Sequence, residues 1–374
     1  MKIDFYKHNL TGEDKQECMK VLDSLFLTTG DVVKEFEQKF SQYLSLPFTI
    51  GVTSCTQALM LALMQIGIGE GDEVVTTPMS FIATANAIEY CRAKPVFVDV
   101  EKTTGNIDAD LIEQAITPKT KAILVVHLYG QMADMITIRK IADKYNLKIV
   151  EDSAHCIEGN RDGVKPGQLG DVACFSFYAT KNITSGEGGA ISCQSKGAMD
   201  WFMKARMHGM SKGAADRYTK KYEHYDMEFL GYKCNMTNLQ AALLLHQLEH
   251  IDQFLSRKDN IARSFDEGFK NNQFINTPTI LTGVKHARHL YSIWVAAEKR
   301  DNYMHRLQDR GIGIAVNFRP IHLMKYYREK YGYTDGNFPN AEKIGNSTIT
   351  LPFYPKLSEK EIQYIISMVN SIIS

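Results

Sequence analysis

From residue 48 onward, short hydrophobic runs rich in valine and isoleucine alternate with longer stretches in which apolar residues recur at helical spacing. The short runs predict β-strands buried on both faces, and the longer stretches predict α-helices. Strands are expected at 48–53, 73–77, 95–98, 122–126, 147–152, 172–177 and 190–193. Helices are expected at 11–27, 31–44, 57–66, 82–91, 108–116, 135–145, 197–206, 239–248 and 251–271. This alternation indicates an α/β fold with a mostly parallel sheet flanked by helices.

The rhythm changes after a polar, proline-containing stretch at 272–286, which we interpret as a linker. Beyond it the pattern predicts a smaller α+β unit, with strands at 291–297, 312–318 and 348–352 and helices at 300–310 and 358–373. We therefore expect two domains, a large one at 1–250 and a small C-terminal one at 251–374. The polar and aromatic stretch 209–229 interrupts the large domain, and a loop of that length is usually functional.

Composition narrows the class of protein. The 374 residues carry 43 basic and 43 acidic side chains, so the formal net charge is zero, which argues against nucleic acid or an anionic membrane as the main partner. No apolar run approaches the roughly 20 residues that a membrane helix needs, and the first residues lack a signal-peptide core. The seven cysteines are scattered and form no Cys-x-x-Cys pair, so we expect reduced thiols, no metal site and a cytoplasmic protein.

The first candidate for chemistry is Lys181. The predicted strand 172–177 runs into a polar turn that holds this lysine, and Gly186, Gly188 and Gly189 follow it. Glycines this dense mark backbone that turns sharply or closely approaches another group. A desolvated lysine on such a turn has a lowered pKa and can act as a nucleophile that forms a Schiff base. The alternative is an ordinary solvated lysine.

A second candidate is the end of the predicted strand 147–152, where Asp152 is followed by His155. In open α/β sheets, ligands bind beyond the carboxyl ends of the strands. A pyridoxal phosphate site needs an anion that faces the ring nitrogen of the cofactor, and it needs a lysine. Asp152 and Lys181 would supply both. The alternatives are a helix N-cap for Asp152 and a half-buried structural role for His155.

These two stretches carry a family resemblance. The segments Glu151-Asp-Ser-Ala-His155 and Ser176-Phe-Tyr-Ala-Thr-Lys-Asn-Ile-Thr-Ser-Gly-Glu-Gly-Gly189 are similar to those of the DegT/DnrJ/EryC1/StrS family. Its members are pyridoxal-phosphate-dependent nucleotide-sugar aminotransferases of fold type I. The resemblance covers essentially the whole chain. It implies the cofactor pyridoxal 5′-phosphate (PLP), a nucleotide-sugar substrate with an amino-acid donor, and a place in polysaccharide biosynthesis.

The resemblance also implies roles for single residues. Lys181 would carry the cofactor and move the proton, and Asp152 would hold the charge on the ring nitrogen. The ring would be fixed by Phe81 and His155, and the phosphate by hydroxyl and amide groups at Ser54, Thr56, Gln57 and Ser176. Cys55 stands where the family usually has glycine, so this turn is expected to be tighter or shifted. Taken alone, the same turn would be a plain Ser/Thr helix cap, and Phe81 a core phenylalanine.

Other implied residues concern the partner subunit and the substrate. Family members are homodimers with shared active sites, and Asn235, with Lys233 as the lesser candidate, would reach the cofactor phosphate of the other subunit. Arg319 and His322 match the segment on the sugar side of the cleft, although weakly, and His322 also suits a structural role. Further candidate cations for a diphosphate lie in the long loop, at Lys212, Arg217, Lys220 and Lys221.

The Thr-Ser-Gly-Glu-Gly-Gly form of the lysine turn resembles members that aminate carbon 4, so we expect a 4-keto-6-deoxy nucleotide sugar with L-glutamate as donor. A 3-keto substrate and a non-catalytic PLP-binding regulator are the alternatives, although no basic helix-turn-helix segment is evident. Dehydrating relatives typically have histidine in place of Lys181. A nicotinamide-dependent enzyme is disfavoured because the glycines at 67–71 follow a predicted helix and lack the required spacing.

Overall fold

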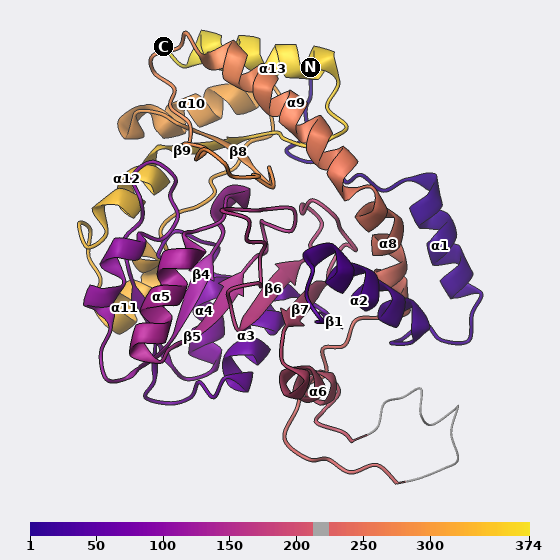
Figure 1. Cartoon of the computed structure of the whole chain (residues 1–374). Coiled ribbons are helices and arrows are strands. Elements are labelled where there is room, and N and C mark those ends of the chain that lie inside the picture. The colour runs from indigo at the N-terminus through magenta and orange to yellow at the C-terminus, as the bar shows by residue number, and fades with distance from the viewer. Residues whose placement is uncertain (212–223) are drawn as a thin grey trace.

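The centre of the molecule is a seven-stranded sheet, which Figure 1 shows in a computed structural model that describes residues 1–211 and 224–374. Its strands follow the order β1-β7-β6-β5-β4-β2-β3. Their bounds are β1 (Phe48–Val52), β2 (Glu73–Thr76), β3 (Lys94–Phe97), β4 (Thr120–Val126), β5 (Lys148–Asp152), β6 (Val172–Ser176) and β7 (Gly189–Cys193). Among these described strands β7 alone runs antiparallel to its neighbours, β1 and β6. The predicted α/β fold with a mostly parallel sheet is confirmed.

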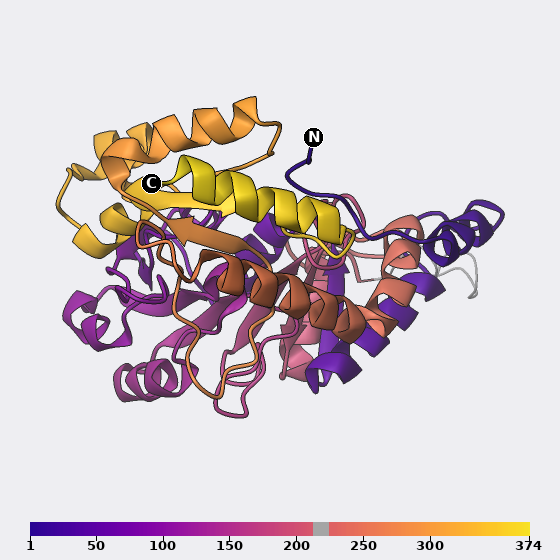
Figure 2. The ribbon, with the colours of Figure 1, turned by 90° about the horizontal axis from the view of Figure 1, so that it is seen from above.

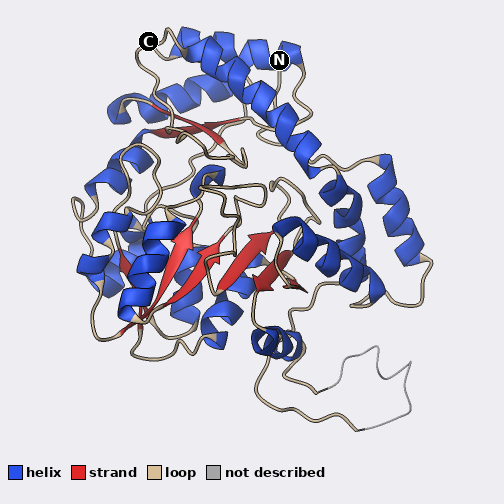
Figure 3. Cartoon of the chain, viewed as in Figure 1, coloured by secondary structure: helices blue, strands red, loops and turns tan. Residues whose placement is uncertain are grey.

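Helices cover both faces of this sheet, as Figure 3 shows. One face packs against α3 (Cys55–Gln65), α4 (Ala83–Tyr90) and α6 (Lys196–Ala205). The other packs against α2 (Asp31–Leu44), α5 (Met135–Tyr145) and α8 (Asn238–Glu249). Side chains alternate along β4, where Leu124 enters the first core and Ile123 and Val125 enter the second. Burial on both faces explains why the strands read as continuous apolar runs.

The C-terminal part of the chain forms its own core. A two-stranded antiparallel sheet, β8 (Tyr291–Trp294) and β9 (Thr348–Leu351), packs with α9 (Ile251–Phe269), α10 (Ala297–Asp309) and α13 (Glu359–Ile372). Figure 2 shows the N-terminal segment close to α13. Ile3 pairs with Ile312 and joins this core, and α1 (Gly12–Leu22) then packs on α8. The division into domains at residue 250 stays a prediction.

Several predicted elements were wrong in detail. The expected helix at 108–116 is two short 3-10 turns, Ala109–Leu111 and Glu113–Ala115, because Pro118 cannot continue a helix and β4 begins at Thr120. The expected strand at 312–318 makes only single bridges, from Ile312 to Ile3 and from Ala315 to Thr350. The helices α11 (Lys325–Tyr331) and α12 (Pro339–Ser347) were not predicted, and α1 ends earlier than expected.

The sheet topology decides where a site can form. The carboxyl ends of β1, β2, β4, β5 and β6 lie at one edge of the sheet because these strands are parallel. The antiparallel β7 brings its first residues to the same edge. The residues that follow these strand ends, and those that precede β7, therefore meet in one place. Within the described ranges, no helix is long and apolar enough to cross a membrane.

Candidate active site

A cavity of about 550 Å³ opens at this edge of the sheet. Its wall includes most of the residues predicted for the site: Ser54, Thr56, Phe81, Asp152, His155, Ser176 and Lys181. They follow or end different strands of one sheet, so the fold alone brings them together. The sequence reasoning missed Phe5, Ser80 and His289 in the wall, and it placed the segment 317–322 at the cleft without giving Asn317 or Phe318 a role.

Lys181 lies on the turn between β6 and β7, where its backbone N–H donates to the carbonyl oxygen of Tyr178 at 2.9 Å. Part of the side chain faces the cavity, but the surrounding protein atoms desolvate the amine. This desolvation lowers the pKa of Lys181 to about 8, although the nearby Cys55 and Asp152 oppose the shift. A substantial fraction of the amine is therefore neutral near pH 8, as a nucleophile requires.

Asp152, the last residue of β5, is buried and held at both oxygens. Its Oδ2 accepts from the Thr84 hydroxyl at 2.7 Å, and its Oδ1 accepts from the Ala154 N–H at 3.2 Å. Burial raises the pKa of Asp152, while these two hydrogen bonds and the nearby Lys181 counter that shift. Ser80 in turn bonds Thr84 at 2.7 Å. Ser80 precedes α4 and Thr84 lies in its first turn, so no helical periodicity links the two hydroxyls in the sequence.

A row of rings forms one side of the cavity. The His155 ring stacks on the His289 ring at a centroid distance of 4.3 Å and on the Phe318 ring at 5.7 Å. Phe318 lies 6.2 Å from Phe81, whose side chain is exposed. Burial lowers the pKa of both histidines well below the usual value, so they are neutral. Buried Nδ1 of His155 has no hydrogen-bond partner in the described part of the chain.

The turn from β1 into α3 begins the helix in the ordinary way. Ser54 is extended, and its Oγ accepts from the backbone N–H of Gln57 at 3.2 Å, so it caps the helix as the simpler alternative supposed. Cys55, in place of the usual glycine, is the first helical residue and is buried. Gly189 packs directly against this turn, because a Cβ there would lie 2.5 Å from the carbonyl carbon of Ser54. That the turn is tighter or shifted relative to the family stays a prediction.

The comparisons with known proteins agree with this geometry. The model of the DegT/DnrJ/EryC1/StrS aminotransferase family matches residues 8–370. The chain belongs to this family. It is 39% identical to the spore coat polysaccharide biosynthesis protein SpsC of Bacillus subtilis (98% of this chain, 96% of the relative). It is 36% identical to the GDP-perosamine synthase of Escherichia coli O157:H7 (100% and 99%).

The fold matches solved structures of the family as well. Spr1654 from Streptococcus pneumoniae, assigned as a sugar aminotransferase and solved in PMP and PLP forms, superposes with a TM-score of 0.94 for the PMP form. That comparison covers 99% of each chain at 32% identity. The predictions of a PLP-dependent sugar aminotransferase and of its cofactor are therefore confirmed at the level of the family.

The cavity fits PLP on its own evidence. A buried carboxylate, a desolvated lysine and the unpartnered Nδ1 of His155 line one space, and Asn317 adds a buried oxygen atom without a partner among the described residues. The first residues of α3 line the same space, and the backbone amides at a helix start suit a phosphate. Asp152 and Lys181 would hold the ring and the aldehyde carbon, and Ser54, Thr56 and Ser176 the phosphate.

Four residues of the predicted site do not line the cavity. The side chain of Gln57 accepts from the Thr53 hydroxyl. Asn235 lies beside the end of β1, where it donates to Thr29 Oγ1 at 2.7 Å and accepts from Lys233. Arg319 donates to the carbonyl oxygen of Leu323, and buried His322 pairs with Glu342 at 3.0 Å. Their binding roles stay predictions, while Lys212, Arg217, Lys220 and Lys221 lie outside the described residues.

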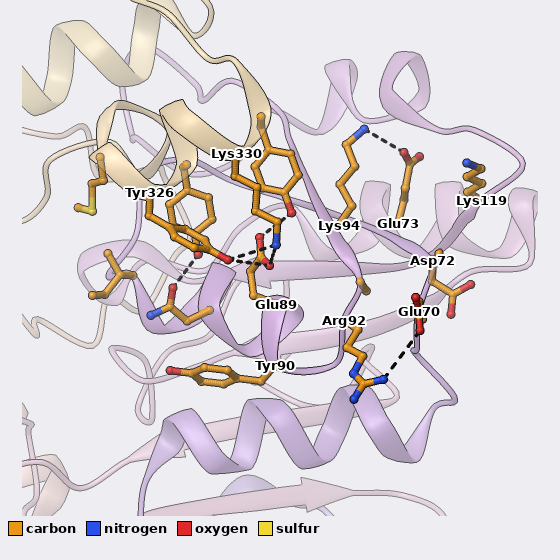
Figure 4. Close-up of a pocket in the computed structure, with 17 residues that line it drawn as sticks. Glu70, Asp72, Glu73, Glu89, Tyr90, Arg92, Lys94, Lys119, Tyr326 and Lys330 are labelled. Atoms are coloured by element: carbon orange, nitrogen blue, oxygen red, sulfur yellow. Dashed lines mark hydrogen bonds and ion pairs between the residues drawn. The ribbon is translucent and has the colours of Figure 1, made fainter.

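A larger hollow, of about 1060 Å³, runs along α4 and α11 and reaches the opposite edge of the sheet (Figure 4). Three of its acidic side chains are paired with neighbours in the hollow itself. Glu89 contacts Lys330, Tyr326 and Tyr331, while Glu73 pairs with Lys94 at 3.1 Å and Glu70 with Arg92 at 3.9 Å. This hollow holds neither Lys181 nor Asp152, so its size does not make it the active site.

Proposed function

We propose that this protein transfers the amino group of L-glutamate to a 4-keto-6-deoxy nucleotide sugar. The observation that carries the proposal is the meeting of Lys181 and Asp152 in one cavity at the carboxyl edge of the sheet. Membership of a sugar aminotransferase family supports the reaction type. A relative that is named GDP-perosamine synthase and that aligns along the entire chain supports a nucleotide-linked sugar. The Thr184-Ser-Gly-Glu-Gly-Gly189 form of the lysine turn supports carbon 4.

The residues of the cavity have different roles in the proposed reaction. When bound, PLP withdraws electrons from the carbon that carries the amino group, and this makes a proton on that carbon acidic. Asp152 would hold the charge on the ring nitrogen of the cofactor, and the Thr84 hydroxyl and the Ala154 amide favour the ionised form of this carboxyl group. The Lys181 amine would remove this proton and return one, because it is neutral in part near pH 8. The His155 ring, which stacks on His289, would limit movement of the cofactor ring.

The test follows the cofactor through one half of the reaction. The enzyme is first converted to its pyridoxamine form with L-glutamate and freed of the keto acid. It is then offered 3-keto and 4-keto nucleotide sugars separately, and the absorption band of the aldehyde form is recorded. The band should return with the 4-keto-6-deoxy substrate. Return of the band with 3-keto substrates only would refute amination at carbon 4. Return of the band with free keto acids only would refute a nucleotide-sugar substrate.

We also propose that the active enzyme is a homodimer in which Asn235 reaches the phosphate in the partner subunit. The position of Asn235 supports this. It pairs with Val52, just before the turn from β1 into α3 that we call the phosphate turn, and yet it does not line the cavity of its own subunit. Inactive Lys181→Ala protein mixed with Asn235→Ala protein should regain activity on subunit exchange, because one hybrid site would keep both residues. A fully active monomer in light scattering would contradict this proposal.

A further inference from the structure

The residue that follows the lysine, Asn182, is the centre of a buried polar network. Its side-chain N–H groups donate to both oxygens of Glu158, at 2.7 and 2.9 Å, and to the Ala287 carbonyl oxygen at 2.7 Å. Its Oδ1 accepts from the amine of Lys258 at 3.1 Å. The amide therefore lies between an acidic and a basic side chain, and its bonds to them fix its orientation.

Glu158 and Lys258 are both almost completely buried, with 3% and 5% of their surface exposed. Burial raises the pKa of Glu158 and lowers the pKa of Lys258, and each charge opposes the shift of the other. Lysine and glutamate are almost never buried so fully unless they are paired. Desolvating the two charges destabilises the fold, so a structural role alone would be served as well by apolar side chains of the same volume.

The same network reaches the row of rings in the cavity. The amine of Lys258 also donates to the backbone carbonyl oxygen of His289 at 3.2 Å. The Nδ1 atom of His289 lies 3.4 Å from Asn182 Oδ1, and its ring stacks on His155. Lys258 belongs to α9, and its amine lies 4.9 Å from the centre of the Phe353 ring in the C-terminal core. One side chain thus contacts the lysine turn, the ring row and the C-terminal core.

A second set of hydrogen bonds holds the other end of the Lys181 turn. Gln247 on α8 accepts from the Thr184 N–H at 3.1 Å and donates to the Thr184 carbonyl oxygen at 2.8 Å. The backbone around Lys181 is therefore held at residue 184 by an amide and at residue 182 by a pair of charges. Charge-assisted hydrogen bonds are stronger than neutral ones. The stronger of the two contacts therefore holds residue 182, which is next to Lys181.

We propose that Glu158 and Lys258 are positioning residues for the reaction, which act through Asn182 on the Lys181 turn and through His289 on the His155 ring. The proposal rests on the function proposed above, because it assumes that Lys181 is the reacting amine. Neither charged residue lines the cavity. Their effect is geometric: an amine displaced by about 1 Å from the productive position costs roughly 100-fold in rate.

The test neutralises both charges together in the variant Lys258→Met/Glu158→Gln. Side chains of similar volume without charge leave no unpaired buried ion, so this variant should fold and bind PLP. We expect kcat to fall about 10- to 100-fold with KM within a few-fold, because positioning is lost while substrate contacts remain. The visible circular dichroism of bound PLP should also weaken, a readout that needs no substrate. The matched control is Arg257→Met, which removes a charge one residue away that pairs with Glu359 at 3.0 Å.

A double-mutant cycle separates positioning from general destabilisation. If the charges act through Asn182, then Asn182→Ala alone lowers kcat by a similar factor, and adding it to the neutral pair causes little further loss. Additive losses would overturn the proposal, as would a neutral pair with unchanged kcat and dichroism. Should the double variant not fold, Asn182→Ala with normal kcat and dichroism overturns it alone. If the wild-type enzyme converts no nucleotide sugar, the proposed function fails, and the dichroism still tests the positioning role.

Discussion

Gly189 is the position at which the smallest possible side chain should disturb the cofactor site. A Cβ on this residue would lie 2.5 Å from the Ser54 carbonyl carbon, 2.6 Å from the Cys55 nitrogen and 2.8 Å from the Ser54 oxygen. All three are backbone atoms of the turn that leads into α3, so none can move aside by rotating a side chain. In Gly189→Ala the two backbones must separate by about 1 Å, and overpacking of this kind costs about 1–3 kcal/mol.

The strain caused by Gly189→Ala should chiefly weaken the binding of PLP. If the strain displaces the phosphate turn, the dissociation constant of PLP rises about 5- to 150-fold, the equivalent of about 1–3 kcal/mol. Titration of the cofactor-free enzyme with PLP measures this constant, and calorimetry of the same protein should show a Tm lower by a few degrees. Gly69→Ala is the matched control, because a Cβ at Gly69 meets no atom within 4 Å.

An unchanged PLP dissociation constant in Gly189→Ala would refute the reasoning. It would mean that β7 or the start of α3 yields without moving the groups that are predicted to bind the cofactor. A lower Tm with normal affinity would refute it equally, since the strain would then be carried by the pairing of β7 with β1 and β6. Only a loss of affinity well beyond that of Gly69→Ala supports a close fit between Gly189 and the phosphate turn.

Three further changes test the rest of the site. Asp152→Asn should bind PLP but lower kcat about 1,000-fold, since a charge about 4 Å away is worth about 4 kcal/mol at an effective dielectric constant of 20; near-normal turnover would contradict it. Covalent uptake of PLP by the cofactor-free enzyme should rise with pH and level off above about 8, where the Lys181 amine is neutral. A rate that keeps rising to pH 10 would exclude the lowered pKa. Thr84→Val removes a 2.7 Å hydrogen bond that favours the Asp152 carboxylate, so the pKa of Asp152 rises and the acid limb of the activity profile should move to higher pH. An identical pH profile of kcat would show that Thr84 does not tune this carboxylate.

The sequence predicted the sheet well because its strands are buried on both faces. Such strands need apolar residues at every position, and runs like Ala122-Ile-Leu-Val-Val126 leave little choice of structure. The same reasoning failed at 312–318, where the apolar residues pair singly with Ile3 and Thr350 from distant parts of the chain. Local pattern records that a residue is buried, but it does not record which partner buries it.

Prediction of the site was limited in the same way. Lys181 and Asp152 stand at strand ends, and the parallel topology then brings them to one edge of the sheet. His289 and Phe318 come from connections in the C-terminal part of the chain, and only tertiary packing stacks them with His155. The alternation over 312–318 marks Phe318 as apolar, but it does not identify His155 as its partner. The Glu158–Asn182–Lys258 network has the same origin, because its members belong to three segments that meet only in the folded chain.

The simpler alternative for Ser54, a helix cap, is compatible with the functional one, whereas the N-cap alternative for Asp152 was wrong because the described residues 153–171 form no helix. Ser54 caps α3 through the Gln57 N–H, but a helix start has four amides without partners inside the helix, and one cap leaves others free for an anion. Asp152 accepts from Ala154 and Thr84, yet each carboxylate oxygen has a further lone pair. The local hydrogen bonds hold both groups in one orientation before any ligand arrives, so little ordering remains to be done on binding. Ser54 and Asp152 are therefore already oriented to bind a ligand at the carboxyl edge of the sheet, and for Ser54 the helix cap and the ligand role support each other.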